Sequence, residues 1–219
     1  MQFAHIMFIP GLFFISSLVL QRWMEKNAFT NIIKLYLIGI AAGLVIDLIL
    51  SLFNPIFDSK PHHMTIFLKS IIIDGFLFSS LIIVSLYFAI DFFCDISINL
   101  DWSMTSLLSA SYIFGIYTVV DILQAFSVNY PGNFFQYLSL IPFLLTVSLI
   151  IGFGIPKYMD SFGIAEKIIW AVFTIVIPAV LFTVYSYLKF YNYIEQYLII
   201  IPFISLALIF EIKDFKYFR

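Results

Sequence analysis

The stretch FLKSIIIDGFLFSSLIIVSLYFAIDFF, residues 67–93, decides the fold of this chain. As an α-helix rising 1.5 Å per residue it would reach about 40 Å, more than the ~30 Å hydrocarbon core of a bilayer. A strand of a membrane barrel needs only about ten residues and alternates polar with apolar side chains, and this stretch does neither. It therefore predicts a transmembrane helix, and it carries a carboxyl group, Asp74, well inside that helix.

The rest of the chain has the same character. Of its 219 residues, 63% are hydrophobic and 11% are charged, whereas ordinary soluble proteins have roughly 25% charged residues. The formal net charge of −2 gives no reason to expect a nucleic-acid partner, and the single cysteine, Cys94, excludes an internal disulfide. We therefore expect residues 1–219 to form one membrane-embedded helical domain, with the lipid bilayer as its surroundings.

Seven apolar segments are long enough, or nearly so, to cross a bilayer as helices. They predict an all-α fold, a polytopic bundle of about seven transmembrane helices. The first segment lacks the positive region and the small-residue cleavage site of a signal peptide, so we expect it to remain as a helix. The seventh is interrupted by Pro202. The segments are Phe3–Gln21, Ile32–Phe53, Phe67–Phe93, Met104–Phe126, Phe134–Phe153, Ile168–Leu188 and Gln196–Phe210.

Lysine and arginine residues predict the orientation, because cytoplasmic loops carry an excess of them. With seven spans, eight lie on the side that holds the carboxyl terminus and three on the other side. This predicts a multi-pass protein of the cell membrane with its N-terminus outside and its C-terminus in the cytoplasm. The abundance of Phe, Ile and Tyr with little Ala indicates an AT-rich bacterial genome. The eight are Arg22, Lys26, Lys34, Lys157, Lys167, Lys213, Lys216 and Arg219, and the three are Lys60, Lys69 and Lys189.

Three aspartates, Asp47, Asp74 and Asp121, lie inside otherwise apolar spans, each in a different span. A carboxylate in hydrocarbon costs about 2.5–3.5 kcal/mol on insertion scales, so such residues usually serve a function. Counted from the outer ends of the predicted spans, the three lie at depths of about 9, 10 and 8 Å. This predicts one layer of carboxyls around a polar cavity near the outer leaflet. The alternative is that each is a protonated side chain, hydrogen-bonded within the core.

Small and polar neighbours indicate which helix faces line that cavity. Gly39, Gly43, Asp47 and Ser51 follow one another at four-residue intervals and share a helix face. The Gly-x-x-x-Gly half of this stripe permits close helix packing, so we expect the stripe to face the bundle. The other side chains expected to line the cavity share a face with Asp74 or Asp121, and they are Ser70, Tyr117, Thr118 and Gln124.

The familiar motifs of cofactor and metal sites are absent from the sequence. The chain has no glycine-rich phosphate loop, no Cys-x-x-Cys and no His-Glu-x-x-His, so no cofactor is expected. His62 and His63 lie close to Asp58 in the loop predicted before the third span. A histidine pair in a short loop is usually exposed to solvent, and the sequence leaves open whether these residues bind a metal.

Two of the aspartates lie in patterns that resemble the motifs of the PrsW family of intramembrane proteases, relatives of the CAAX-processing proteases. That family carries Glu-Glu-x-x-Lys on one helix and Gly-x-Phe-x-x-x-Glu-Asn on the next, and later helices each contribute a histidine. The first motif falls on residues 74–78, DGFLF, and the second on residues 115–122, GIYTVVDI. The stretch FIPGLF at residues 8–13 also resembles the start of such proteins.

The resemblance implies hydrolysis of peptide bonds by a water molecule that glutamates and histidines activate. Asp74 and Asp121 stand for two of the glutamates, but the other groups are replaced, and no histidine follows His63. General acid–base catalysis needs a proton donor and an acceptor close to the reacting group. The replacements are Gly75 for the second glutamate, Phe78 for the lysine, Ile122 for the asparagine and Phe182 for a histidine of the sixth span.

These replacements predict a PrsW-like protein that has lost its catalytic chemistry. Whether it is an enzyme stays open, because two carboxyls that share a proton can still act as acid and base. Asp74 and Asp121 are then the candidate catalytic residues of an intramembrane endopeptidase, with another transmembrane protein as substrate or partner. Two alternatives involve no proteolysis. One is a small transporter or proton- or cation-coupled carrier with helices broken at prolines, and the other is a non-enzymatic assembly partner in a membrane complex.

Overall fold

The third predicted span forms an unbroken helical rod from His63 to Phe93. It consists of α4 (His63–Lys69), the π-helical segment η2 (Ser70–Leu77) and α5 (Phe78–Phe93). The computed structural model describes residues 10–11, 13, 26–53, 55, 63–93, 102–126 and 134–190. Within these residues the other long elements are also helices, and they are α3 (Lys26–Phe53), α6 (Trp102–Phe126), α7 (Phe134–Asp160) and α8 (Ile164–Phe190).

The all-helical prediction is confirmed for the part of the chain that the structure describes. Four helices there are long and apolar enough to cross a membrane, and a shorter apolar stretch, Met104–Val120, lies in α6. These helices indicate a multi-pass membrane protein. The count of seven spans is not confirmed, because Gln196–Phe210 and nearly all of Phe3–Gln21 lie outside the described residues.

Four helices begin earlier than the sequence predicts, among them α6 at Trp102 rather than Met104 and α8 at Ile164 rather than Ile168. α3 begins at Lys26 rather than Ile32. The third span begins at His63 rather than Phe67, so His63, predicted in a loop, lies in the first turn of α4 with its side chain exposed. Hydropathy marks where a helix enters hydrocarbon, whereas the backbone hydrogen bonds of a helix continue into the interfacial region beyond it. The helices therefore exceed the apolar windows that revealed them.

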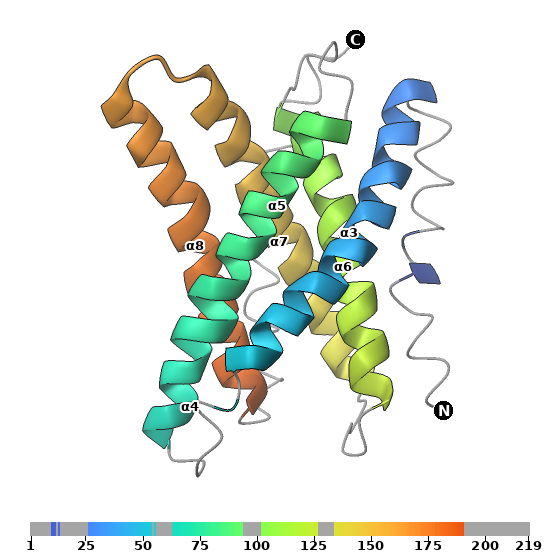
Figure 1. Ribbon diagram of the computed structural model, residues 1–219, viewed down its shortest axis with the longest axis vertical. Coiled ribbons are helices and arrows are strands. Elements are labelled where there is room, and N and C mark those ends of the chain that lie inside the picture. The colour runs from blue at the N-terminus through green and yellow to red at the C-terminus, as the bar shows by residue number, and fades with distance from the viewer. Residues whose placement is uncertain are drawn as a thin grey trace.

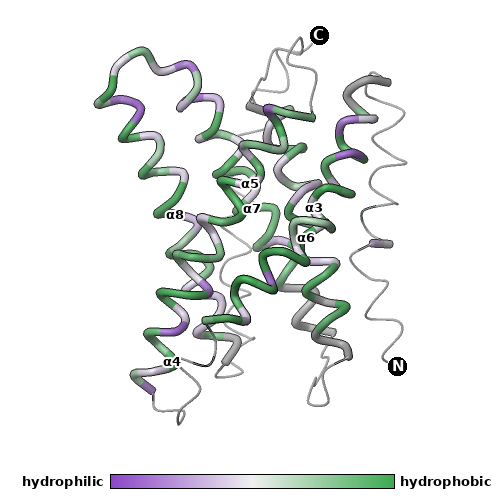
Figure 2. The backbone as a smooth tube through the Cα atoms, in the orientation of Figure 1, coloured by the Kyte–Doolittle hydropathy of each residue, from purple (hydrophilic) through white to green (hydrophobic). Residues whose placement is uncertain are grey.

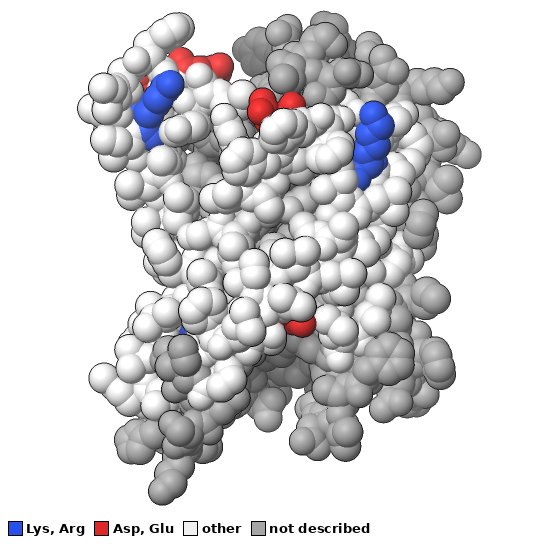
Figure 3. Space-filling view, in the orientation of Figure 1, with Lys and Arg blue, Asp and Glu red and all other residues white. Residues whose placement is uncertain are grey.

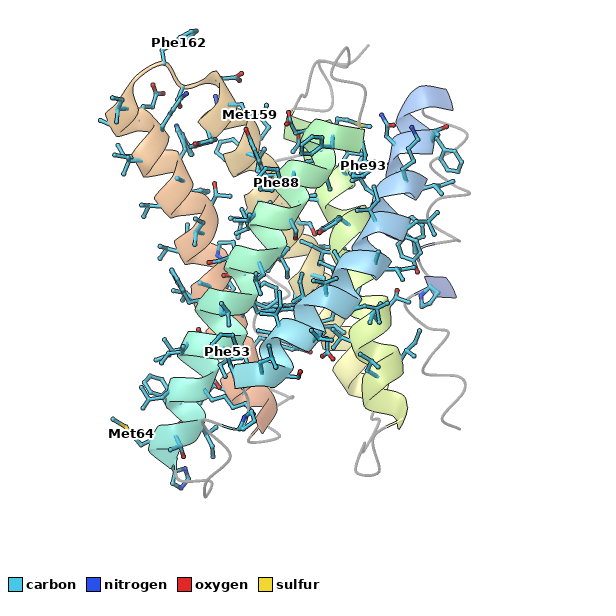
Figure 4. The ribbon with its side chains drawn as sticks, in the orientation of Figure 1. Phe53, Met64, Phe88, Phe93, Met159 and Phe162 are labelled. Atoms are coloured by element: carbon cyan, nitrogen blue, oxygen red, sulfur yellow. The ribbon has the colours of Figure 1, made fainter. Side chains whose placement is uncertain are left out.

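The turn between α7 and α8 is shorter than predicted. The predicted spans leave residues 154–167 between them, but α7 continues through Pro156 as far as Asp160, and α8 begins at Ile164. A proline keeps a helical φ angle, and membrane helices tolerate it where neighbouring groups satisfy the freed carbonyl. The remaining turn carries Phe162 fully exposed at its tip, pointing away from the bundle (Figure 4).

Successive helices run in opposite directions (Figure 1). The N-terminal ends of α3, α6 and α8 lie at the same end of the bundle as the C-terminal ends of α5 and α7 (Figure 1). Apolar residues occupy most of each helix (Figure 2), and on the face seen in Figure 3 charged side chains gather mainly toward that same end. These directions agree with alternating membrane crossings, while the side that faces the cytoplasm stays a prediction.

Helix α6 packs against α3 with almost no side chain between the two backbones. A Cβ atom on Gly39 would lie 2.2 Å from the carbonyl oxygen of Tyr112, and one on Gly115 would lie 2.3 Å from that of Tyr36. Gly43 faces Ile116 in the same way. Small residues allow this close approach between membrane helices. The Gly-x-x-x-Gly face of α3 therefore packs into the bundle, as its spacing predicts.

Helix α7 lies between α6 and α8 and contacts both through glycines. A Cβ atom on Gly152 would lie 2.3 Å from the Cα atom of Ser106 in α6. One on Gly154 would lie 2.0 Å from Oγ1 of Thr174 in α8. The helices of the described bundle are thus brought together at points where one partner has no side chain.

Replacing Gly39 by alanine is expected to destabilise the bundle strongly. The new methyl group would meet the backbone carbonyl of Tyr112, which cannot move without shifting α6. Overpacking of this kind costs about 1–3 kcal/mol and at times more. Thermal unfolding of the detergent-solubilised protein measures the effect.

Two comparisons make this prediction specific. Gly163→Ala is the neutral control, since the nearest atom to its new Cβ would be 3.9 Å away. Gly154→Ala should be damaging alone and largely rescued by Thr174→Ala, because the close atoms at that position all belong to the Thr174 side chain. Equal unfolding temperatures for Gly39→Ala and Gly163→Ala would contradict the backbone contact.

Candidate functional site

Asp74 lies in the π-helical segment η2, which separates two α-helical segments of one rod. The amide of Phe78 closes this segment with hydrogen bonds to the carbonyls of Ile73 and Gly75. The Asp74 side chain is partly buried. Fewer than about 1% of residues in soluble proteins are π-helical, and π-bulges occur frequently at functional sites. The carboxyl predicted to be functional therefore lies at a local irregularity of the backbone.

Segment η2 touches α8 at Gly75, the neighbour of Asp74. A Cβ atom on Gly75 would lie 2.0 Å from Oγ1 of Thr183 and 2.8 Å from the carbonyl oxygen of Ala179. Thr183 Oγ1 itself donates to that Ala179 oxygen, at 2.8 Å. The absence of a side chain at Gly75 thus allows the backbone beside Asp74 to reach α8.

The Asp74 carboxyl is hydrogen-bonded across this contact. Ser186 Oγ on α8 donates to Asp74 Oδ2. Tyr117 of α6 is buried, and its ring and that of Tyr185 both belong to the aromatic cluster of Phe182 and Phe143. We call Asp74, Ser186, Tyr117 and Tyr185 the Asp74 centre. It combines one carboxyl, bonded by Ser186, with two tyrosines from α6 and α8.

An aromatic cluster encloses one side of the Asp74 centre. Phe182 of α8, which is 2% exposed, contacts Phe78, Tyr117 and Phe143 with ring centroids 5.1, 6.5 and 5.2 Å apart. Phe143 also stacks on Tyr185 at 4.4 Å. Four segments, α5, α6, α7 and α8, therefore meet around one ring. Phe182 is the residue at which the resemblance to PrsW-type proteases would place a histidine.

The predicted cavity residues separate into two groups. Tyr117 and Asp74 belong to the Asp74 centre, and Ser70 is buried at the start of η2. Thr118 does not belong to it, because its hydroxyl is bonded to Tyr36 Oη of α3 at 3.0 Å. This bond directs Thr118 toward α3, whereas the ring of Tyr117 packs on Phe182 of α8. The sequence argument had grouped them because both lie close to Asp121.

Asp47 does not join Asp74. It is partly exposed on α3, and it has no hydrogen bond or ion pair with the described residues. Ser51, one turn later, is exposed and donates to Leu48 of its own helix. Only the glycine half of the predicted stripe faces the bundle, because α3 and α6 approach closely at the glycines and diverge toward Phe53 (Figure 1).

The depths of the aspartates also change when they are counted from the observed helix ends. Asp74 lies about 16 Å from the start of its rod at His63, whereas Asp47 and Asp121 lie about 9 and 8 Å from the ends of α3 and α6. The side chains of Asp121 and Gln124 lie outside the described part, so their place in a cavity stays a prediction. The ends of α3 and α6 lie where the sequence predicts them, and only the start of the third span differs, so the single layer of carboxyls stays a prediction.

Sequence reasoning missed Ser186 as the partner of Asp74. Thr183 and Ser186 lie on α8 in an otherwise apolar stretch, and a hydroxyl in a membrane span commonly bonds a polar group on a neighbouring helix. That rule singles out Ser186 as polar but cannot choose its partner. Among the described residues, no group of three His, Cys, Asp or Glu side chains is arranged to hold a metal ion.

The hydrogen bond between Asp74 and Ser186 is expected to be measurable as a coupling free energy. A double-mutant cycle with Asp74→Ala and Ser186→Ala should give about 0.6–1.7 kcal/mol, the average and upper values for such bonds between membrane helices. Unfolding of the purified protein in mixed detergent micelles measures each variant.

Ser148 provides the matched control for this cycle. It is equally a serine of a membrane helix, but it is buried on α7 and donates to Leu144 of its own helix at 2.7 Å. A cycle between Asp74→Ala and Ser148→Ala should therefore be additive. Additivity in the Ser186 cycle as well would mean that the contact contributes nothing.

No family model, curated protein or solved structure matches this chain. The arrangement around Asp74 is therefore interpreted from its own chemistry.

Proposed function

We propose that this chain is a multi-pass membrane protein related in design to PrsW-type intramembrane proteases but without their hydrolytic chemistry. In this proposal the Asp74 centre binds a polar group of a transmembrane partner instead of cleaving it. The observation that carries the proposal is the packing of Phe182. Its buried ring contacts Phe78, Tyr117 and Phe143 where the resemblance would require an imidazole.

The chemistry of the Asp74 centre supports binding over hydrolysis. Hydrolysis by acid–base catalysis needs a group that accepts a proton from water and a group that returns one to the leaving amine. The Asp74 centre offers one carboxyl, already bonded by Ser186, and tyrosine hydroxyls. The sequence has no histidine after His63, which lies exposed in the first turn of α4. These groups suit hydrogen bonding to an amide or hydroxyl.

A residual aspartate dyad is the enzymatic alternative. Asp121 lies one turn after Tyr117 on α6, and residues four apart share a helix face. Because the ring of Tyr117 packs on Phe182, the backbone places Asp121 on a face of α6 related to that contact. Two carboxyls in reach of each other could share a proton as an acid–base pair. This alternative requires that loss of either aspartate abolishes cleavage.

The route of a partner to the Asp74 centre is sideways from the bilayer. Asp74 and Ser186 lie between η2 and α8, and the outer faces of these two segments carry the exposed side chains Phe76 and Val184. A transmembrane helix of another protein can lie along this face. Such a helix has no hydrophobic gain from leaving lipid, so a polar residue facing Asp74 would supply the specific part of its binding.

The carrier interpretation remains the second candidate. It is favoured by two helical irregularities at one contact, the π-helical segment around Asp74 and Pro178 in α8, beside the Ala179 carbonyl that Gly75 approaches. Interrupted helices frequently surround the ion and substrate sites of transporters. The Asp74 centre would then bind a proton or a cation. An assembly role without any ligand would leave Asp74 as a purely structural hydrogen-bond acceptor.

Cleavage of a transmembrane substrate is expected to be absent. Single-pass reporters co-expressed with wild type, Asp74→Ala and Asp121→Ala should show identical processing on immunoblots, because the centre lacks a second acid–base group. Variants must be present in the membrane at equal levels. Processing that needs both aspartates would replace the binding proposal with the dyad enzyme.

Binding of a polar transmembrane segment is expected at the face formed by η2 and α8. A photoreactive benzoyl-phenylalanine at Phe76 should cross-link a reporter helix with one central asparagine about 3- to 20-fold better than its leucine counterpart, as interhelical hydrogen bonds of about 0.6–1.7 kcal/mol imply. Asp74→Leu should remove this preference.

Phe88 is the control position for the cross-linker. Phe88 is similarly exposed, at 52% against 56% for Phe76. It lies in the regular helix α5, near the C-terminal end of the rod. No preference for asparagine is expected there. A preference at Phe88, or one at Phe76 that survives Asp74→Leu, is incompatible with recognition by the Asp74 centre.

A further inference from the structure

The π-helical segment η2 lies between a weakly packed and a firmly packed piece of the same rod. α4, before it, contains no buried residue. α5, after it, buries a continuous face that includes Phe78, Ile82 and Leu86. The register of the rod is therefore set by α5. The helical type of residues 70–77, π or α, then determines the direction of the Asp74 carboxyl.

The contacts with α8 occur inside the π-helical segment itself. Gly75 makes the close approach to Thr183 and Ala179, and Asp74 accepts the hydrogen bond from Ser186. A π-helical turn contains more residues than an α-helical turn, so each residue in η2 is rotated relative to its α-helical position. The rotation accumulates backward from Phe78, and at Asp74 it amounts to tens of degrees.

We propose that η2 contains one residue more than a continuous α-helix would need over the same length, and that this extra residue orients Asp74 toward Ser186. This inference rests on the proposed function in one respect, that the Asp74 centre is the binding site. Removal of one residue from η2 would let residues 63–93 form a continuous α-helix, keep the packing of α5 and turn the Asp74 carboxyl away from α8. The geometry required for binding would be lost together with the contact of Gly75 with α8, while the packing of α5 is kept.

Segment η2 also contains a residue whose own side chain is packed little. Ile72 is 48% exposed and lies on the face away from the core, whereas the buried members of η2 are Ser70, Ile73 and Gly75. Val84 is 51% exposed in the regular helix α5 and is also β-branched. Deleting Val84 shifts the register of the α5 core face, and deleting Ile72 does not.

The test compares the deletions of Ile72 and of Val84 in the full chain. Asp74→Cys and Ser186→Cys are introduced together with Cys94→Ser, which removes the only native cysteine. Oxidation should cross-link the two cysteines in the undeleted protein. In the Ile72 deletion the cross-link should fall by about tenfold or more, because cysteines whose Cα atoms lie beyond about 7 Å cannot bridge without backbone movement.

Thermal unfolding completes the test. The Ile72 deletion should unfold below the parent temperature, because it also removes the contact of Gly75 with α8. The Val84 deletion should unfold far lower still or fail to accumulate, because it shifts the core face of α5. An undiminished cross-link in the Ile72 deletion would overturn the orienting role, and an Ile72 deletion as unstable as the Val84 deletion would overturn the extra-residue interpretation. Neither readout depends on a bound partner, so a failure of reporter binding alone would count against the proposed function only.

Discussion

Close approach of backbones at glycines is the constraint on which the described bundle depends. In lipid, helices gain little from the hydrophobic effect when they associate, so their packing must come from short contacts. Gly39 and Gly115 provide them between α3 and α6, Gly152 and Gly154 provide them on the two sides of α7, and Gly75 provides them between η2 and α8. The last of these contacts also brings a carboxyl to its hydrogen-bond donor. Structure and candidate function therefore meet at Gly75.

The Asp74 centre combines a polar and an aromatic environment. Ser186 supplies a hydrogen bond to the carboxyl, and the rings of Phe182, Tyr117 and Phe143 lie close by. A hydrogen bond formed in a partly buried site of low dielectric is electrostatically stronger than one in water, which favours recognition of a partner's amide or hydroxyl. The same rings occupy the region where a hydrolytic enzyme would place a second catalytic group. The proposed binding role follows from both features.

The sequence predicts the helical class and the middle of each described helix well, because long apolar stretches have only one stable backbone conformation in a membrane. It also predicts the inward face of Gly39 and Gly43 from their spacing. It does not predict η2, since residues 70–77 carry no proline or other local signal for a change of helical type. Nor does it predict the bond between Asp74 and Ser186, which depends on how two distant segments are placed in space.

Other differences between prediction and structure have equally specific causes. Thr118 was grouped with Tyr117 by proximity along the chain, but one step along a helix changes direction, and Thr118 bonds Tyr36 on α3 instead. The common depth of the aspartates used hydropathy to locate helix ends, and the third span begins at His63, before its apolar stretch. In both cases the sequence identified polar residues in membrane helices. The surroundings of these residues depend on their angular position around the helix axis and on where the helix begins.

The exposed turn between α7 and α8 has a consequence for how deeply these two helices sit in a bilayer. Phe162 extends from the tip with its ring uncovered, and Lys157 and Glu166 lie within one or two turns of it. A deeper position of the turn would move Lys157 and Glu166 into hydrocarbon. A shallower position would leave the Phe162 ring surrounded by water. Both costs favour one depth, at which the turn between α7 and α8 lies at the headgroup boundary of the bilayer.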